Sequence, residues 1–414
     1  MNSLKKLILK YGEPDALIDH WDDTSKNMAI WGYDEIFYYD ENGFYLNEKE
    51  IDGNPLELCD KILNKWNDDS PLAHAVGYIS YDMKNNLYPH LNFKKNNNQK
   101  LIWFGKPKLI KEYLLLEDDE LNNEENFDKK YYKNLFKINM GIPNIEEYVA
   151  KINKIKYYLK LGDTYQINYS NPIKCNYSCS KFSLYLYLRS IAKPANGFYL
   201  NTGENQILSL SPEKFFETKN DKIYTYPIKG TINRSDDIVE DNKLKKQLRK
   251  SEKDKAEHLM IVDLLRNDLG KICQYGTVQV ENLYNIKSFE TIHHMETTVY
   301  GNLLENINFK DIIIALFPGG SITGAPKERS MEIIDEIETY NREIYTGAIG
   351  YISSKRYMNF NIAIRTLNFK NNQGLYPVGG GIVWDSTAKG ERKEALNKAK
   401  IIEKIVSNKL EEYA

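Results

Sequence analysis

The chain has 414 residues, of which 42% are hydrophobic, so it is long enough to bury a large core in one or more domains. A formal net charge of −2 gives no bulk electrostatic attraction to nucleic acid or to an anionic membrane, and neither is expected as a partner. The N-terminus lacks the apolar core of a signal peptide, and no stretch approaches the roughly eighteen apolar residues of a membrane span. We therefore expect a soluble, cytoplasmic protein.

The N-terminal part of the chain, residues 1–116, contains short stretches of alternating polarity, such as residues 72–81, that predict strands. Residues 117–140 begin with an acidic, asparagine-rich segment without periodicity, which we interpret as a polar connection. The sharp motifs all lie in residues 141–414. Four scattered cysteines do not form two pairs at zinc spacing, so reduced thiols are the favoured interpretation over half of a metal site at Cys175 and Cys179.

Strands and helices come in runs along this C-terminal region. Apolar residues at helical spacing predict a helix that ends at Gly162, and Ser251 is a suitable N-cap for a second helix. The expected helices are 145–161, 252–268, 326–339 and 391–412, and the expected strands lie within 197–233 and 345–384. Because these elements do not alternate strictly as βαβ units, we expect an α+β fold built on large, mainly antiparallel sheets.

Two glycine-rich motifs could bring the backbone close to a ligand. Gly319 and Gly324 have the spacing of a P-loop, but Ala325 stands where a P-loop has its lysine, so that kind of phosphate site is excluded. An anion site at a helix N-terminus and a tight strand-to-helix turn both remain open for this motif. The second motif, Gly379–Gly381, indicates either a close backbone approach to a ligand or a bent strand.

Three glutamates stand on predicted helices. Glu391 and Glu394 are three residues apart and share one helix face, and Glu257 lies in the first turns of another helix. Mg²⁺ prefers oxygen ligands and typically takes one or two protein carboxylates together with waters. Paired acids on helices are, however, most often solvated, so this pattern alone does not separate a metal site from an ordinary surface.

Lys229 stands between Ile228 and Gly230 in a predicted turn with few neighbouring charges. Burial would lower the pKa of this lysine and free its amine to act as a nucleophile. A solvent-facing turn lysine is the alternative interpretation. Each of these signals is weak by itself, whereas their order along the chain is specific.

Taken together, the motifs resemble those of the chorismate-utilising enzyme family over roughly residues 145–410. The resemblance implies an anthranilate-synthase-component-I-like fold, with large antiparallel sheets in a sandwich flanked by helices, in which residues 1–116 are interwoven with a chorismate-binding region at 141–414. The motifs that carry it, in family order, are Gly162–Asn168, Ser211–Glu213, Pro227–Thr231, Lys255–Asp268, Phe317–Lys327, Tyr345–Gly350, Ile364–Thr366 and Gly379–Ser386.

Two positions distinguish the branches of this family. Lys229 is typical of enzymes that form 4-amino-4-deoxychorismate from chorismate and ammonia, the first step towards 4-aminobenzoate and folate, whereas anthranilate-forming relatives carry alanine there. Gln166 matches the ammonia-using branch, because water-using relatives have lysine at that position. The resemblance therefore implies an amino-group transferase, with an anthranilate-forming enzyme as the alternative. A catalytically inactive binding subunit is disfavoured because the set of chemical residues is intact.

The resemblance also implies roles for individual residues. Lys229 would attack C2 of chorismate while Glu213 protonates the leaving C4 hydroxyl. Mg²⁺ would be held by Glu257 and Glu394, with Glu391 acting through a water, and would bind the ring carboxylate. The substrate-binding residues would be Arg365, Tyr345, Ser321, His294, Thr231, Gly379, Gly380 and Gly381.

His294 has a second interpretation, because His293 and His294 on one strand would point to opposite faces, one inward and one outward. Ammonia would come from a separate glutamine amidotransferase subunit, since the sequence has no Gly-x-Cys-x-Gly nucleophile elbow. The N-terminal third departs from the family: it keeps only the segment Gly77–Asp82 and lacks a recognisable tryptophan-binding motif.

Overall fold

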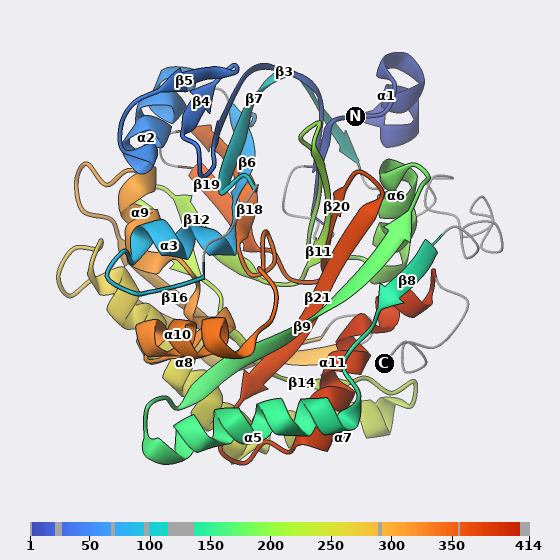
Figure 1. The fold of residues 1–414 in the computed structure, drawn as a ribbon, viewed down its shortest axis with the longest axis vertical. Coiled ribbons are helices and arrows are strands. Elements are labelled where there is room, and N and C mark those ends of the chain that lie inside the picture. Colours follow the sequence, from blue (N-terminus) through green and yellow to red (C-terminus); the bar gives the residue numbers. More distant parts are fainter. Residues whose placement is uncertain are drawn as a thin grey trace.

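The computed structural model describes residues 2–20, 27–67, 71–94, 99–114, 136–288, 292–354 and 357–405. Its strands pair into one extended, mainly antiparallel sheet system, in which β1 and β7 form the parallel pair (Figure 1). The strands are β1 (Asn2–Ser3), β2 (Ala16–Asp19), β3 (Asn27–Tyr39), β4 (Phe44–Leu46), β5 (Lys49–Ile51), β6 (Ala75–Ile79), β7 (Ile102–Leu114), β8 (Phe136–Met140), β9 (Gln166–Tyr177), β10 (Asn196–Asn201), β11 (Asn205–Ser211), β12 (Lys214–Lys219), β13 (Lys222–Thr225), β14 (Ile228–Asn233), β15 (Gln279–Ser288), β16 (Ile292–Asn302), β17 (Gly324–Ala325), β18 (Ala348–Ser354), β19 (Tyr357–Ile362), β20 (Thr366–Lys370) and β21 (Gln373–Ile382).

The helices cover the edges and outer faces of this sheet system (Figure 1). They are α1 (Leu4–Tyr11), α2 (Pro55–Trp66), α3 (Lys84–Leu87), α5 (Ile145–Leu161), α6 (Lys181–Ala192), α7 (Ile238–Lys250), α8 (Glu252–Gly270), α9 (Phe309–Leu316), α10 (Lys327–Ile337) and α11 (Ala388–Glu403), with short 3₁₀ turns η1 (Tyr81–Met83) and η3 (Gly320–Ile322). The expected α+β architecture with antiparallel sheets is thus confirmed. Among the described residues, no helix combines the length and apolarity required to cross a membrane.

Strands of the N-terminal part pair directly with strands of residues 141–414. β6 pairs with β18, and β2 pairs with β10, in both cases antiparallel. Residues 117–135 of the expected polar connection lie outside the described residues, and residues 136–140 form β8 along β9.

The helices form where local sequence signals predict them. α5 buries Tyr148, Ile152 and Ile155 at helical spacing, and it ends at Gly162, whose φ of 78° suits a residue without a side chain. Ser251 caps α8 by accepting a hydrogen bond from the backbone N–H of Asp254. Several expected boundaries were wrong. α8 runs on to Gly270, and α10 spans Lys327–Ile337 with Pro326 as its N-cap residue. α11 spans Ala388–Glu403, and residues 406–412 of its expected range lie outside the described residues.

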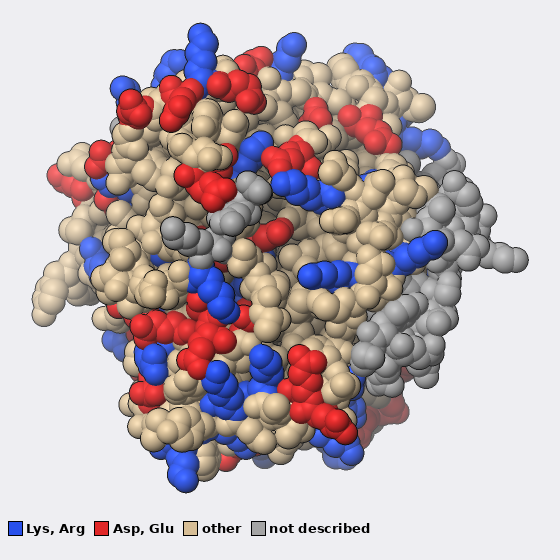
Figure 2. Space-filling view, viewed as in Figure 1, with Lys and Arg blue, Asp and Glu red and all other residues tan. Residues whose placement is uncertain are grey.

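The large core lies between the β9–β21 ribbon and helices α5, α6 and α11. β9 and β21 pair over ten residues, from Gln373 opposite Asn176 to Ile382 opposite Ile167, and they cross the middle of the molecule together (Figure 1). This ribbon carries the glycine motif and Gln166, so its position fixes one wall of the site described below. On the face shown in Figure 2, acidic and basic side chains are interspersed, in keeping with the near-neutral net charge.

Candidate active site

Every residue that the sequence predicted for the site lines one cavity of about 280 Å³. Its walls come from β9, β14, β16, η3 and β21 and from helices α8 and α11, so segments far apart in the sequence meet there. The predicted residues that it brings together are Glu213, Lys229, Thr231, Glu257, His294, Ser321, Tyr345, Arg365, Gly379, Gly380, Gly381, Glu391 and Glu394.

Lys229 lies within β14 at a β-bulge rather than in the turn that its sequence context predicted. The register against β16 shifts between Lys229 and Thr231, and the intervening Gly230 has φ of 72°. The bulge directs the lysine into the cavity, where its Nζ would lie 3.3 Å from a Cβ atom placed on Gly381. Burial of the ammonium group lowers the pKa of Lys229, and the negative charges of Glu213 and Glu257 oppose this shift.

Glu213 lies between β11 and β12 and is buried. The Ser321 hydroxyl donates a hydrogen bond of 2.8 Å to its Oε1 atom. Burial raises the pKa of Glu213 to about 7, against the opposing effects of the Ser321 hydrogen bond and the Lys229 charge. A carboxyl with this pKa carries its proton in a substantial fraction of molecules near neutral pH, as a general acid requires.

Two of the predicted metal ligands converge on the glycine motif. A Cβ atom on Gly380 would lie 3.3 Å from Oε1 of Glu394 and 3.4 Å from Oε2 of Glu391, so the glycine leaves room for both carboxylates. Burial raises the pKa values of Glu257 and Glu391. Burial would also raise the pKa of Glu394, but the ion pair with Lys398 and the charges of Lys229 and Lys253 together outweigh it and lower that pKa.

The carboxylates suit a hard, hydrated cation. Among the described residues, no three Asp, Glu, His or Cys side chains are close enough together to hold a metal ion by themselves. Mg²⁺ usually needs only one or two protein carboxylates, and water and substrate oxygens complete its coordination. The space at Gly380 between Glu391 and Glu394 therefore fits this chemistry.

Arg365 and Tyr345, predicted to bind the enolpyruvyl carboxylate, also line the cavity. Arg365 lies between β19 and β20 with φ of 50°, and its carbonyl accepts the backbone N–H of Leu210 at 3.1 Å. Tyr345 is buried, and burial raises the pKa of its hydroxyl above the ordinary value, so it remains a neutral hydrogen-bond donor.

His294 and Thr231 are cross-strand neighbours on β16 and β14. His294 is buried, with its Nε2 atom 3.6 Å from Oε2 of Glu296. The alternation of His293 and His294 is as expected, but His293 does not face solvent. Its ring lies between Asp241 of α7, at 3.0 Å, and the hydroxyl of Ser288, at 2.8 Å, because α7 covers that face of the strand.

Lys327, at the end of the glycine turn before α10, holds this turn in place. Lys327 pairs with Asp268 of α8 at 2.8 Å and donates to the carbonyl of Leu316 at 3.1 Å, both within the protein interior. This ion pair fixes the turn against α8 and leaves Ser321 facing the cavity.

Sequence reasoning missed several lining residues. Lys398 pairs with Glu394 at 2.7 Å and donates to the carbonyl of Gly379 at 2.8 Å, and its position four residues after Glu394 could have indicated this pair. Lys253, Asp254, Asn168 and Tyr376 also line the cavity and carried no comparable local signal.

Gln166, which served above only to distinguish branches, is fully buried beside the cavity. Its Cδ and Nε2 atoms would lie 3.0 Å from a Cβ atom on Gly381. Within the described part of the chain, neither polar atom of this carboxamide has a hydrogen-bond partner.

Comparison with known proteins gives a consistent family. The family model for chorismate binding enzymes matches residues 18–404 of this chain. Aminodeoxychorismate synthase component 1 of Escherichia coli (strain K12) is 42% identical over 253 residues, 61% of this chain and 56% of that protein. The chain therefore matches just over half the length of this relative.

A longer match is found with anthranilate synthase component 1 of Bacillus subtilis (strain 168), which is 32% identical over 373 residues, 80% of this chain and 72% of that protein. The crystal structure of anthranilate synthase component I from Streptococcus pneumoniae TIGR4 superposes with a TM-score of 0.78 at 27% identity, covering 92% of each chain. The anthranilate-synthase-like fold is thereby confirmed, and the chain belongs to the family of chorismate binding enzymes.

Proposed function

We propose that this protein converts chorismate and ammonia to 4-amino-4-deoxychorismate, with Lys229 as a covalent nucleophile. The observation that carries the proposal is the environment of Lys229: an amine with a lowered pKa, in a cavity that also holds a carboxyl with a pKa of about 7. The pair supplies a nucleophile and a general acid in one site. Similarity to aminodeoxychorismate synthase component 1 supports the same activity.

In the first step, the neutral amine of Lys229 forms a bond to C2 of chorismate. Both ring double bonds shift, from C1=C2 to C1=C6 and from C5=C6 to C4=C5. The C4–oxygen bond breaks as they shift, and Glu213 gives its proton to the departing hydroxyl, which leaves as water. Ser321 orients the Glu213 carboxyl through the 2.8 Å hydrogen bond. The adduct amine then loses its extra proton to the ionised Glu213, which restores the acid.

In the second step, ammonia forms a bond to C4, both ring double bonds shift back to C5=C6 and C1=C2, and the C2–nitrogen bond to Lys229 breaks. The leaving lysine takes up a proton, which Glu213 can return, and the product loses one proton from its new ammonium group. Two successive allylic displacements place the new amine at the carbon that lost the hydroxyl. Arg365 and Tyr345 would hold the enolpyruvyl carboxylate during both steps, since arginine forms bidentate pairs with planar anions.

The proposal includes Mg²⁺ held by Glu257 and Glu394, with Glu391 acting through a water. When bound, the ion supplies a Lewis acid for the ring carboxylate and draws electron density away from C2. Before the ion binds, Lys398 offsets the charge of Glu394 through their 2.7 Å ion pair. Backbone N–H groups of Gly379–Gly381 would contribute to binding of substrate carboxylates.

Ammonia would reach the cavity from a separate glutaminase subunit. The designation component 1 in the relatives' names supports a partner subunit. A mixture of this chain with a glutamine amidotransferase subunit should form product from glutamine, whereas this chain alone should use ammonium salts only.

Anthranilate formation is the second candidate, because the anthranilate synthase relative matches a larger part of the chain. The two activities differ at Lys229: a lysine attached to C2 blocks ammonia from adding there, and ammonia must then attack C4. An enzyme without an amine at this position would leave C2 open to ammonia.

Product identification tests the proposal. Purified protein, chorismate, ammonium and Mg²⁺ are incubated, and the products are separated by chromatography and identified by mass. We expect 4-amino-4-deoxychorismate from the wild type, loss of this product in Lys229→Ala, and no effect of Lys250→Ala, an exposed lysine at the end of α7. Formation of blue-fluorescent anthranilate by the wild type would contradict the proposal.

A further inference from the structure

Among the described residues, no strand pairs with one edge of β9 between Ile167 and Lys174, where β9 borders the cavity. β17 pairs with Gln166 and Ile167, and β8 pairs with β9 only from Lys174 onwards. Between these pairings, β21 occupies the other edge, opposite Asn168 and Ser170. Backbone groups on the open edge need partners, because an unpaired buried N–H or C=O group destabilises the fold.

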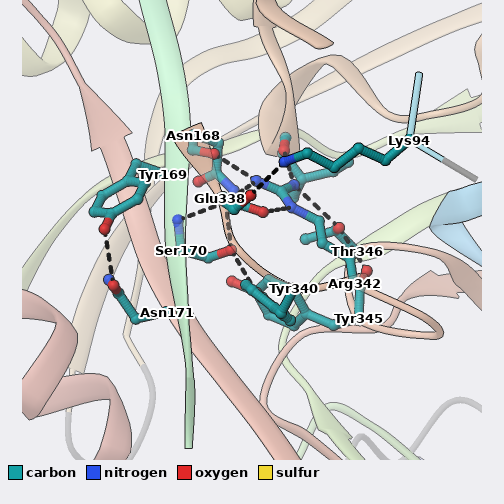
Figure 3. Close-up of polar contacts among 11 residues, drawn as sticks. Lys94, Asn168, Tyr169, Ser170, Asn171, Glu338, Tyr340, Arg342, Tyr345 and Thr346 are labelled. Carbon is teal, nitrogen blue, oxygen red and sulfur yellow. Dashed lines mark hydrogen bonds and ion pairs between the residues drawn. The ribbon is translucent and has the colours of Figure 1, made fainter. Parts of the chain in front are cut away.

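On this edge, the backbone of β9 is hydrogen-bonded instead by a buried ion pair of Glu338 and Arg342 (Figure 3). Oε1 of Glu338 accepts the backbone N–H of Ser170 at 2.8 Å and the Ser170 hydroxyl at 2.7 Å. Nη2 of Arg342 donates to the carbonyl of Asn168 at 2.6 Å. The side chains of the pair are only 1% and 2% exposed, so water does not substitute for these bonds.

Arg342 uses its whole guanidinium group in this way. Two bonds go to Glu338, from Nε at 2.8 Å and from Nη2 at 2.7 Å. Nη1 donates to the carbonyl of Ile322 at 3.1 Å and to the hydroxyl of Thr346 at 3.2 Å. With the bond to Asn168, all five N–H donors of an arginine are engaged.

The acceptors belong to three separate walls of the cavity. Asn168 and Ile322 line it directly, and Ile322 follows Ser321, which orients Glu213. Thr346 follows Tyr345, and it holds φ of 60°, a conformation that a β-branched residue rarely adopts. The guanidinium also lies 5.9 Å from the centre of the Tyr345 ring. Arg342 itself does not line the cavity.

We propose that Arg342, held by Glu338, is a positioning residue that fixes three walls of the catalytic cavity at once without touching the substrate. The kinetic test of this inference rests on the proposed function, because it measures chorismate consumption. Lysine cannot replace Arg342, because it has three donors on one nitrogen and lacks the planar fork that reaches four different acceptors. Arg342→Lys should therefore lose hydrogen bonds that hold three parts of the cavity: Asn168 on β9, the turn at Ser321, and the segment at Tyr345.

The chain offers a matched control in Arg189 and Asp19. This ion pair is also buried, with side chains 1% and 0% exposed, and Nη1 of Arg189 lies 3.0 and 3.1 Å from the two carboxylate oxygens. Neither residue lines the cavity. Arg189→Lys therefore reproduces the general cost of weakening a buried ion pair, without a connection to the site.

Steady-state kinetics of chorismate consumption compare the two variants. For Arg342→Lys we expect a higher KM, because Tyr345 moves, and a lower kcat, because the Ser321–Glu213 geometry changes, with kcat/KM reduced about 10- to 100-fold. For Arg189→Lys we expect kcat and KM within about twofold of the wild type. Equal kinetic losses in both variants, or none in Arg342→Lys, would overturn the inference.

Thr346→Val provides a milder variant, because valine matches threonine in shape. It removes the acceptor of one Arg342 bond and the hydroxyl that donates to the carbonyl of Tyr345. It should fold, and we expect a rise in KM in the same direction as in Arg342→Lys but smaller. Wild-type values of KM and kcat in this variant would also count against the positioning role.

Hydrogen exchange followed by mass spectrometry separates this inference from the proposed function. Faster exchange is expected in Arg342→Lys at residues 166–171, 319–324 and 344–347, and not in Arg189→Lys. This result does not depend on which product is formed or on whether chorismate is consumed. Unchanged exchange in those three segments would refute the inference even if the enzyme made 4-amino-4-deoxychorismate.

Discussion

The Ser321 hydroxyl donates to Oε1 of Glu213 at 2.8 Å, and this bond links the glycine turn before α10 to the proposed general acid. The hydrogen bond favours the ionised carboxylate, whereas burial favours the protonated form and dominates, giving a pKa of about 7. The proton on Glu213 is therefore retained below about pH 7 and lost above it. Because the first chemical step also needs the neutral amine of Lys229, its rate should have an acid limb from protonation of Lys229 and an alkaline limb from loss of the Glu213 proton.

Ser321→Ala should move that alkaline limb to higher pH. Loss of the hydroxyl removes an interaction that lowers the pKa of Glu213, so the carboxyl keeps its proton at higher pH. The measurement is the pH dependence of chorismate consumption in a single turnover without ammonia, so that the titration of ammonium does not intervene. Ser190→Ala on α6, away from the cavity lining, should keep the wild-type profile. A limb that stays in place or moves to lower pH in Ser321→Ala would contradict this assignment of Glu213.

Glu394→Gln should raise the Mg²⁺ concentration needed for half-maximal activity by at least about tenfold, because the amide keeps the shape but removes the charge that binds the cation. A titration of activity against Mg²⁺ measures this change. Glu252→Gln, at an 86% exposed side chain on α8, is the control and should leave the titration unchanged. Equal Mg²⁺ requirements in both variants would remove Glu394 from the metal site.

Alanine at two neighbouring glycines should give different defects. A Cβ atom on Gly379 would lie 2.1 Å from the carbonyl oxygen of Tyr169, a backbone atom that can move only if β9 and β21 separate. Gly379→Ala should therefore lower the melting temperature strongly. A Cβ atom on Gly380 would meet only the ends of the flexible side chains Glu391, Glu394 and Lys398, at 3.3 to 3.4 Å.

Gly380→Ala should accordingly fold with nearly wild-type stability but require more Mg²⁺ for activity. Thermal unfolding and a Mg²⁺ titration of the two variants separate the outcomes. A Gly380→Ala protein with an unaltered Mg²⁺ requirement would show that the space beside this glycine does not receive the ion.

The sequence predicted much of this architecture because the relevant signals are local. The helical spacing of Tyr148, Ile152 and Ile155 and the stop at Gly162 depend only on neighbouring residues, and α5 has the expected bounds. The bulge at Lys229 depends on register against β16, so the sequence suggested a turn instead. Similarly, the covering of His293 by Asp241 of α7 depends on a contact 52 residues away.

The catalytic set was predicted through the order of its motifs, and the structure brings every predicted member to one cavity. The residues that position the catalytic set were not predicted from the sequence. Arg342 and Glu338 look like an ordinary i, i+4 surface pair in the sequence. Nothing local shows that no strand of the described residues pairs with β9 beside them. Lys398 could have been found from its spacing to Glu394, whereas the contribution of Asn168 depends on the pairing of β9 with β21.

The most direct test concerns the covalent bond at Lys229. Protein mixed with chorismate and Mg²⁺ but no ammonia should gain the mass of chorismate less one water, and peptide mapping should locate this gain at Lys229. Addition of ammonium should then release the adduct as 4-amino-4-deoxychorismate. If Lys229→Ala still makes that product at the wild-type rate, and no adduct forms on the wild type, the amine is not the nucleophile.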